Sequence, residues 1–215
     1  MVVLHLVSAA CHRHRSRSSR RHGRYNRSGV RVLDLVILAM WVLFWLYWLA
    51  SAASAKSSRS PSNLSMGIGL RVVAFLLIVL LLRTNVITEN SFGAVESPVA
   101  RGVGFGLFIL GLALAVWARV FLGRNWGTPM SEKVDATLVT TGPYRYIRHP
   151  IYAGLILAMV GTALAVTIYW LIVALVLGIY FVYSASVEER TMSRLFPTTY
   201  PAYKKSTHML IPFIL

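Results

Sequence analysis

Charged side chains gather directly before an apolar stretch in the second half of the chain. Residues 140–154 read TTGPYRYIRHPIYAG, which places Arg145, Arg148 and His149 ahead of Pro150. Proline suits the first position of a helix, because the N–H that it lacks would have no partner there. A helix N-terminus offers free N–H groups and a partial positive charge. The segment therefore predicts a site for an anion, such as a carboxylate or a phosphate, and the alternative is a basic loop at a membrane edge.

Two of the seven acidic residues, Glu188 and Glu189, stand side by side at the end of the last long apolar stretch. A carboxylate is costly near lipid, and an acid at a helix C-terminus opposes the helix dipole. Arg190 and Arg194 follow within about a turn and offer partial compensation. The pair is either a solvated helix end or a functional carboxylate pair, and the residues alone leave both open.

A zwitterionic ligand fits these two segments together. The predicted helix start attracts negative charge and the glutamates attract positive charge. Gly154, one turn into the helix, has no side chain and would let a ligand approach the backbone closely. S-adenosylmethionine has an α-carboxylate, an α-amine and a sulfonium, so its charges match such a pocket.

Five apolar stretches predict the elements that position these residues. The stretches lack the alternation of barrel strands, and helices satisfy their own backbone in lipid. Gly104, Gly106 and Gly111 in the third stretch allow close helix packing. Only Thr167 separates the fourth stretch from the fifth, which favours a helical hairpin. The stretches are residues 32–53, 67–82, 103–122, 151–166 and 168–187.

The composition agrees with a membrane protein. Of the 215 residues, 56% are hydrophobic and 13% are charged, whereas soluble domains have roughly 45–50% and 25%. Eight of the 22 basic residues lie between Arg13 and Arg31, so much of the net charge of +15 belongs to an N-terminal arm. A single cysteine, Cys11, excludes a disulfide framework and a cysteine-rich metal site, and we predict no metal.

The second half resembles the isoprenylcysteine carboxyl methyltransferase family, which is related to the phospholipid N-methyltransferases. The runs LVTTGPYRYIRHPIYAG, EERTMSRLFPTTYPAYKK and LIPFIL carry the resemblance, which covers about residues 124–215. The RHPxYxG and EE…F…Y…Y…IP elements are specific as an ordered set. The resemblance implies an integral membrane enzyme that transfers a methyl group from S-adenosylmethionine.

The resemblance also implies the site residues. The segment before the fourth span, the start of that span and Glu188 would hold the cofactor, with Arg148 and Gly154 as part of the motif. A carboxylate acceptor needs no general base, whereas an amine must arrive deprotonated, which Glu189 or His149 would assist. The implied cofactor residues are Ala136, Thr137, Leu138, Val139, Tyr144, His149, Pro150, Ile151, Tyr152, Gly154 and Glu188, and the catalytic candidates are Arg148, His149, Glu189 and Arg190.

The sequence departs from the family pattern on the acceptor side. The prenylcysteine enzymes place an arginine four residues before the glutamate, where it would meet the substrate, and Ser184 occupies that position here. A prenylcysteine carboxylate therefore lacks its expected partner, for which Arg190 is a candidate substitute. Pro197 also replaces the usual glycine after Phe196. The acceptor is expected to be apolar or lipid-like, with a carboxylate or an amine as nucleophile.

We therefore predict an all-α integral membrane protein with about five transmembrane helices, including a helical hairpin of spans 4 and 5, and a C-terminal cofactor-binding tail. Residues 1–31 form a basic arm expected to be disordered, residues 32–122 three N-terminal transmembrane helices, and residues 123–215 the catalytic cofactor-binding region. The basic residues of that region favour a cytosolic active site.

Several matters stay open. The arm is either a solvated tail or a contact for anionic lipid, and no specific nucleic acid is expected. The side of the membrane on which the arm lies, its presence in the mature protein, the oligomeric state and the acceptor are undetermined. The alternative functions are an NADPH-dependent membrane reductase of the sterol-reductase type and a non-enzymatic membrane interaction protein.

Overall fold

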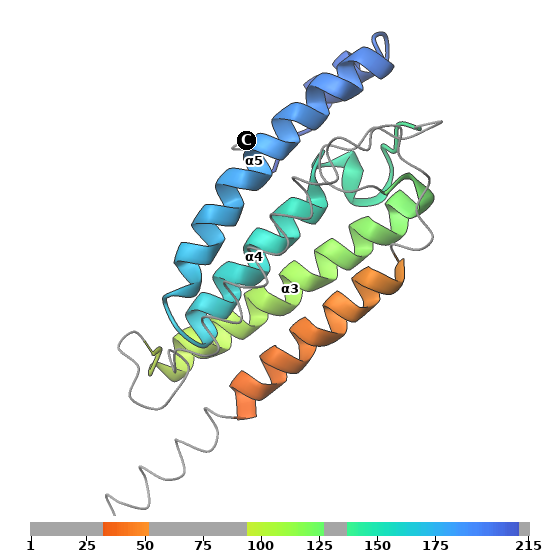
Figure 1. Cartoon of the computed structure of the whole chain (residues 1–215). Helices are drawn as coiled ribbons and strands as arrows, with labels where there is room; N and C mark the ends of the chain where they lie inside the picture. Colours follow the sequence, from red (N-terminus) through yellow and green to blue (C-terminus); the bar gives the residue numbers. More distant parts are fainter. Residues whose placement is uncertain (1–31, 52–93, 127–136, 211–215) are drawn as a thin grey trace, which may run out of the picture. The chain divides into compact units, whose positions relative to one another are not determined.

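The computed structural model describes residues 32–51, 94–126 and 137–210 (Figure 1). The chain divides into two compact units, Met1–Leu43 and Phe44–Leu215. The described part is helical and contains no strand, in agreement with the predicted all-α class. Its elements are the helix Val32–Ser51, α3 (Pro98–Leu122), η1 (Gly123–Asn125), η2 (Gly142–Arg145), α4 (Pro150–Ala165), α5 (Trp170–Leu195) and α6 (Tyr200–Ser206).

Three described helices are long and apolar enough to cross a membrane: Val32–Ser51, α3 and α5. The fourth predicted span is confirmed as a helix, but α4 has only 16 residues and counts as a shorter apolar helix. The second predicted stretch and the basic arm lie outside the described residues. The structure thus supports a membrane protein with several apolar helices, and the predicted number of five spans stays a prediction.

Two helix boundaries differ from the predicted ones. Helix α3 begins five residues early, at Pro98, because the Ser97 side chain accepts a hydrogen bond from Ala100 N and caps the first turn. Helix α5 continues to Leu195, eight residues beyond the predicted end at Val187. The glutamate pair therefore lies inside α5, more than a turn from its end, so the expected conflict with the helix dipole does not arise.

Helices α3 and α4 touch through their backbones at glycines. A Cβ atom on Gly111 would lie 2.5 Å from Gly154 O, and one on Gly104 would lie 2.7 Å from Gly161 O. The predicted close packing is confirmed for these two α3 glycines, whereas Gly106 faces open space. The expectation that Gly154 lets a ligand approach the helix is corrected by this packing. The space beside Gly154 is occupied by the backbone of α3.

Helices α4 and α5 form the predicted hairpin. Thr167 is buried in the turn, where its carbonyl accepts a hydrogen bond from Trp170 N at 3.1 Å. The start of α4 and the end of α5 consequently lie at the same end of the hairpin (Figure 1). At this end Gly142, with a φ of 60°, turns the chain as its Gly-Pro sequence predicts, and η2 follows.

The chain after α6 returns to the segment that precedes α4. His208 N donates to Tyr146 O at 3.1 Å, and Arg148 N donates back to His208 O at 2.8 Å. His149 N likewise donates to Met209 O at 3.1 Å. These backbone bonds hold the C-terminal segment beside the start of α4, so residues far apart in the sequence share one site.

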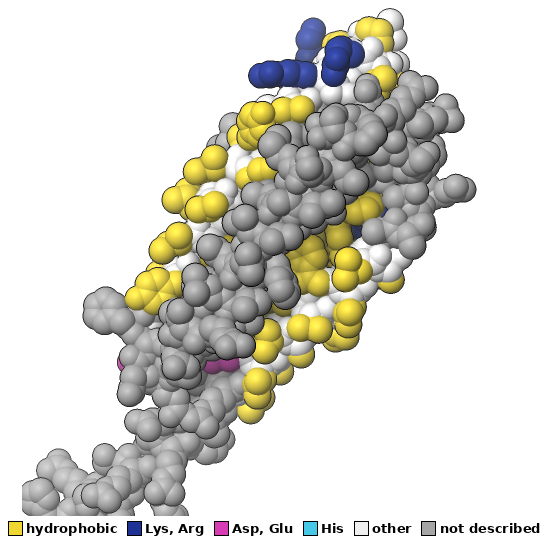
Figure 2. Space-filling view, viewed as in Figure 1, with side chains coloured by type: hydrophobic (Ala, Val, Ile, Leu, Met, Phe, Trp, Pro, Cys, Tyr) yellow, Lys and Arg dark blue, Asp and Glu magenta, His cyan; other side chains and the backbone are white. Residues whose placement is uncertain are grey.

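The outward side of α5 is apolar over most of its length. Leu171, Ile172, Leu175, Val176 and Ile179 are all exposed. In Figure 2 hydrophobic side chains follow the helices, while Lys and Arg side chains gather around the C-terminal end of α5. An apolar face of this extent suits contact with a lipid bilayer.

Candidate functional site

Arg148 joins the start of α4 to α5 and to the C-terminal segment. Its Nε donates to Glu189 Oε1 at 2.6 Å, and one terminal nitrogen donates to the carbonyls of Lys204, at 3.1 Å, and of Thr207. The side chains of Arg148 and Glu189 are each only 8% exposed. Lys204 Nζ pairs with the other Glu189 oxygen at 2.5 Å. The Glu189 carboxylate thus lies between two cations, and Arg148 is held by three separate acceptors.

Glu188 lies in a different network, formed by hydroxyl groups. The Tyr152 hydroxyl donates to Glu188 Oε1 at 2.5 Å, and the Ser184 hydroxyl donates to the same oxygen at 3.4 Å. The two hydroxyls are 3.3 Å apart, and Ser184 is completely buried. Ser184, at the position where the family that this sequence resembles has an arginine, is therefore one of two hydroxyls that support the Glu188 carboxylate.

His149 lies between the two carboxylates. Its Nδ1 is 3.5 Å from Glu188 Oε2, and its Nε2 is 3.8 Å from Glu189 Oε1. Burial favours the neutral imidazole, but pairing with both carboxylates outweighs burial, and the pKa of His149 is raised above its ordinary value. The Nε2 atom is buried and has no hydrogen-bond partner among the described residues.

An aromatic stack supports His149. Its ring is parallel to the Tyr152 ring within 7°, with centroids 5.7 Å apart. Tyr152 in turn stacks on Phe181 of α5, with centroids 4.8 Å apart. The stack fixes the plane of the imidazole and covers it from one side.

The structure revises the predicted anion site at the start of α4. Arg148 and His149 face Glu188 and Glu189, so the cationic cluster and the carboxylate pair neutralise each other. Arg145 is exposed, with its guanidinium 6.0 Å from the centre of the Tyr146 ring. The predicted anion site and the predicted carboxylate pair therefore form one interacting group of charges.

Two tyrosines, the buried Tyr144 and the half-buried Tyr203, lie near these charges. Tyr203 donates its hydroxyl to Tyr144 O at 2.6 Å. Burial raises the pKa of Tyr144, and burial also raises the pKa of Tyr203 to about 12. Both phenols therefore stay neutral near neutral pH, and the Tyr203 hydroxyl acts as a hydrogen-bond donor.

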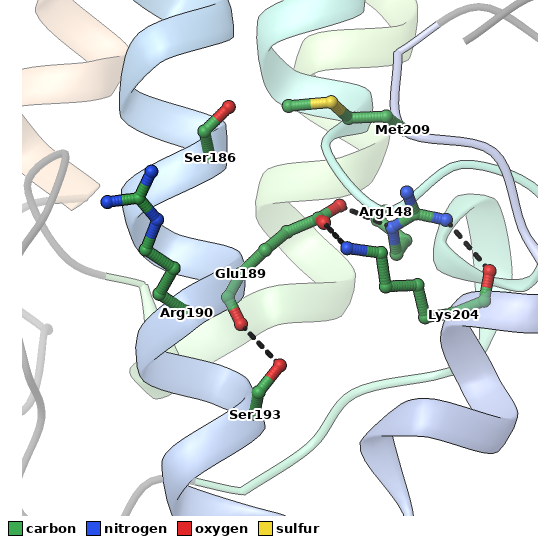
Figure 3. A pocket seen from close by; sticks show the side chains of 7 residues that line it. All are labelled: Arg148, Ser186, Glu189, Arg190, Ser193, Lys204 and Met209. Atoms are coloured by element: carbon green, nitrogen blue, oxygen red, sulfur yellow. Dashed lines mark hydrogen bonds and ion pairs between the residues drawn. The ribbon is translucent and has the colours of Figure 1, made fainter.

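A cavity of about 460 Å³ borders the charged group between α5 and the C-terminal segment (Figure 3). Three of the four catalytic candidates line it, namely Arg148, Glu189 and Arg190. None of the residues implied for the cofactor does. The remaining lining residues are Ser186, Ser193, Lys204 and Met209.

The other implied cofactor residues lie beside the charged group or before it in the chain. Pro150, Ile151 and Tyr152 are buried at the start of α4. Of the preceding segment, Thr137 is exposed and Leu138 and Val139 are half-buried. Ala136 lies outside the described residues, and Gly154 packs against α3.

Sequence reasoning did not select Lys204, Thr207 or Phe181 as site residues. Lys204 and Thr207 contact Arg148 only because the C-terminal segment folds back onto the start of α4. Phe181 lies about two turns before Glu188 on α5, on the same face. This helical spacing could have identified Phe181 as a site residue from the sequence. No local pattern identifies Lys204 or Thr207.

Comparisons with known proteins show that the chain is similar to methyltransferases. The sequence model of the family described as phospholipid methyltransferase matches residues 99–199. A protein-S-isoprenylcysteine O-methyltransferase of Schizosaccharomyces pombe is 32% identical over 113 residues, which cover 51% of this chain and 48% of that protein. A methanethiol S-methyltransferase of Pseudomonas deceptionensis is 26% identical over 126 residues, which cover 58% of this chain and 48% of that protein.

A solved structure is also similar. The eukaryotic intramembrane Ras methyltransferase, an isoprenylcysteine carboxyl methyltransferase, aligns with a TM-score of 0.49 and 20% identity over 74% of this chain and 55% of that chain. The matched stretches span about half the length of the curated relatives, 48% in both cases above.

Proposed function

We propose that this chain, which is related to the isoprenylcysteine carboxyl methyltransferases and the phospholipid methyltransferases, is a membrane-embedded methyltransferase that uses S-adenosylmethionine and acts on an apolar or lipid-like acceptor. The named relatives all transfer methyl groups according to their descriptions. They support methyl transfer over the reductase and the non-enzymatic alternatives.

One observation carries the proposal. The RHPxY run at the start of α4 meets the glutamate pair of α5, so that His149, Tyr152, Glu188 and Glu189 form one interacting group at the end of the hairpin, in which Tyr152 and Glu189 are buried and Glu188 is half-buried. Most of the predicted chemistry therefore converges on a single place. A solvated helix end would not bury a carboxylate against a tyrosine hydroxyl and a histidine.

The residues present fit the cofactor's charges. The Tyr152 and Ser184 hydroxyls and the His149 ring hold the Glu188 carboxylate in place, and its negative charge suits a cationic group such as the α-amine. The buried His149 Nε2, without a hydrogen-bond partner among the described residues, is a polar atom that a ligand can satisfy. When bound, S-adenosylmethionine supplies an activated methyl group on its sulfonium.

The chain's own residues then act mainly by positioning. Oriented reactants can supply about 7–11 kcal/mol of a barrier, and methyl transfer needs little other chemistry. Tyr152 and Ser184 fix the Glu188 carboxylate, while Arg148 and Lys204 fix Glu189. The Tyr152–Phe181 stack keeps water from one side of His149. For an amine acceptor, the neutral form of His149 would take the proton, because Glu189 is paired with Arg148 and Lys204 and is the weaker base.

The proposal includes an orientation and a division of the chain. The basic side chains at the end of α5 and on α6 support an orientation with the site on the cytosolic face. Residues 123–215 form the cofactor-binding region, and residues 32–122 anchor it in the membrane. The acceptor enters from the lipid side and the cofactor from the aqueous side.

Calorimetry on the full chain in detergent tests the site. S-adenosylmethionine should bind saturably to the wild type, and Glu188→Gln and His149→Ala should each abolish or strongly weaken binding. Glu96→Gln removes the same charge from an exposed residue before α3, at the opposite end of that helix, and should bind normally. Wild-type affinity in both site variants would refute the assignment.

A second experiment identifies the acceptor. Membrane extracts are incubated with the full chain and methyl-labelled cofactor, and the labelled product is then identified. Thermal shifts with S-adenosylhomocysteine and with NADPH distinguish the reductase alternative, because stabilisation by NADPH alone would contradict methyl transfer.

A further inference from the structure

The lining of the cavity between α5 and the C-terminal segment carries a net positive charge, for which the proposed reaction gives no role. Its lining contains three cations, Arg148, Arg190 and Lys204, and one carboxylate, Glu189. Glu189 accepts from both Arg148 and Lys204, so these three side chains already satisfy one another in part. The lining as a whole keeps an excess of positive charge.

Arg190 supplies charge that no described group neutralises. The residue is exposed and has no hydrogen bond or ion pair with any residue that the structure describes. Figure 3 shows its side chain pointing away from the Glu189–Lys204–Arg148 group. Arg190 also follows Ser184 by six residues, which places it on a different face of α5. It is therefore not positioned to replace an arginine at Ser184.

The depth of the cavity in the membrane follows from the length of α5. At about 1.5 Å per residue, its 26 residues measure about 39 Å, whereas the hydrocarbon core measures about 30 Å. The exposed apolar face runs from Leu171 to Tyr183, so this part of α5 lies in the core. With Trp170 at one edge of the core, about 20 residues at about 1.5 Å each cross it, so Arg190 lies near the other edge and the turn to Ser193 lies at the depth of the lipid headgroups.

More exposed cations flank the cavity at this depth. Arg194 lies one turn after Arg190 on α5, and Lys205 follows Lys204 on α6. Ser186 and Ser193 donate their hydroxyls to backbone carbonyls of α5, which leaves recognition of a ligand to the cations. An anionic group would therefore be bound mainly by Arg190, with Lys204 and Arg194 beside it.

We propose that this cavity binds the phosphate headgroup of an anionic phospholipid of the surrounding leaflet. The lipid chains would lie along the exposed apolar face of α5, and the headgroup would reach Arg190 and Lys204. A bound lipid of this kind is a ligand distinct from the cofactor, because none of the residues implied for the cofactor lines the cavity.

Native mass spectrometry of the full chain in a mild detergent tests the proposal without cofactor or acceptor. Retention of phosphatidylglycerol is compared with retention of phosphatidylcholine, and inorganic phosphate is added as a soluble competitor. The wild type should retain phosphatidylglycerol selectively. Arg190→Gln should reduce that selectivity about fivefold, which corresponds to about 1 kcal/mol at 1.4 kcal/mol per tenfold change.

Three further variants make the test specific. Arg190→Lys should keep most of the selectivity, and Ser193→Asp, which adds a negative charge to the cavity wall, should reduce it as Arg190→Gln does. Arg145→Gln removes an exposed cation outside the cavity lining and should have no effect. Unchanged selectivity in both Arg190→Gln and Ser193→Asp would overturn the proposal.

Two other outcomes would also overturn it. An equal loss in Arg145→Gln would indicate general surface charge rather than a binding cavity. Displacement of the lipid by inorganic phosphate at matching concentrations would indicate a site for a soluble anion. Because binding is measured without cofactor, failure here leaves the proposed methyltransferase function unaffected, and failure of cofactor binding leaves this proposal unaffected.

Discussion

The Arg148 guanidinium donates to the Glu189 carboxylate at 2.6 Å across 41 residues of sequence, and the two buried side chains join α4 to α5. Arg148 also bonds the carbonyls of Lys204 and Thr207. A single guanidinium thus connects the hairpin to the C-terminal segment. Its planar array of donors suits this task better than a lysine ammonium would.

Loss of this guanidinium should destabilise the protein. Arg148→Ala leaves Glu189 with Lys204 and His149 as its remaining cationic neighbours and removes the donor to the partly buried Thr207 carbonyl. We expect a loss of about 3 kcal/mol, the low end for an unpaired buried charge, because Lys204 remains. Unfolding in detergent measures it. Arg145→Ala, at an exposed arginine nearby, is the control and should change stability by less than about 0.5 kcal/mol.

The glycine contacts between α3 and α4 predict opposite effects for two similar substitutions. A Cβ on Gly111 would lie 2.4 Å from Ala158 N, so Gly111→Ala should destabilise the protein by about 1–3 kcal/mol. Gly106→Ala meets nothing within 4 Å and should stabilise the same helix by about 0.5–1 kcal/mol. The unfolding midpoints of the two variants in detergent test this prediction. Equal shifts would contradict the backbone contact between α3 and α4 at Gly111.

The Tyr152 hydroxyl should contribute to cofactor binding through Glu188. Tyr152→Phe keeps the ring stack but removes the donor to the carboxylate, and a hydrogen bond to a charged group is worth about 1.5–3 kcal/mol. We therefore expect at least a tenfold loss of S-adenosylmethionine affinity in calorimetry. Tyr183→Phe removes an exposed hydroxyl elsewhere on α5 and should bind normally. Unchanged affinity in Tyr152→Phe would show that the hydroxyl does not position Glu188 for binding.

His149 should make stability depend on pH. Its pKa is raised in the folded state because its pairing with Glu188 and Glu189 outweighs burial, while the unfolded chain has an ordinary pKa of about 6.5. The protonated form therefore stabilises the fold fully below about pH 6.5, and this stabilisation is lost as the pH rises through the folded pKa.

The comparison of wild type with His149→Gln measures this effect. The difference in unfolding free energy between the two should be larger at pH 6 than at pH 9. A difference that is constant with pH, or that grows as the pH rises, would contradict the assignment of charge to His149. His208→Gln, at a histidine of the C-terminal segment, is the matched control.

The sequence by itself predicted the described apolar helices and selected most of the residues that the structure brings together at the end of the hairpin. Long apolar runs in a chain with 13% charged residues leave a lipid-embedded helix as the stable state. Pro150 marked the start of α4 and the Gly142-Pro143 pair marked the turn before it, because both act on the backbone locally. The same local rules predicted a start for α3 that is too late and an end for α5 that is too early. Both helices continue beyond their apolar stretches into segments with polar residues.

Only the tertiary structure decided which charges meet. Arg148 and Glu189 each have several possible partners in the sequence, and their pairing depends on the register of α4 against α5. Lys204 reaches the same carboxylate because the C-terminal segment folds back onto the start of α4. Gly154 likewise contacts α3 because of how α3 and α4 pack, which the sequence pattern does not contain. Composition and spacing encode where a segment lies relative to lipid and water, whereas contacts between segments follow from packing that no local pattern contains.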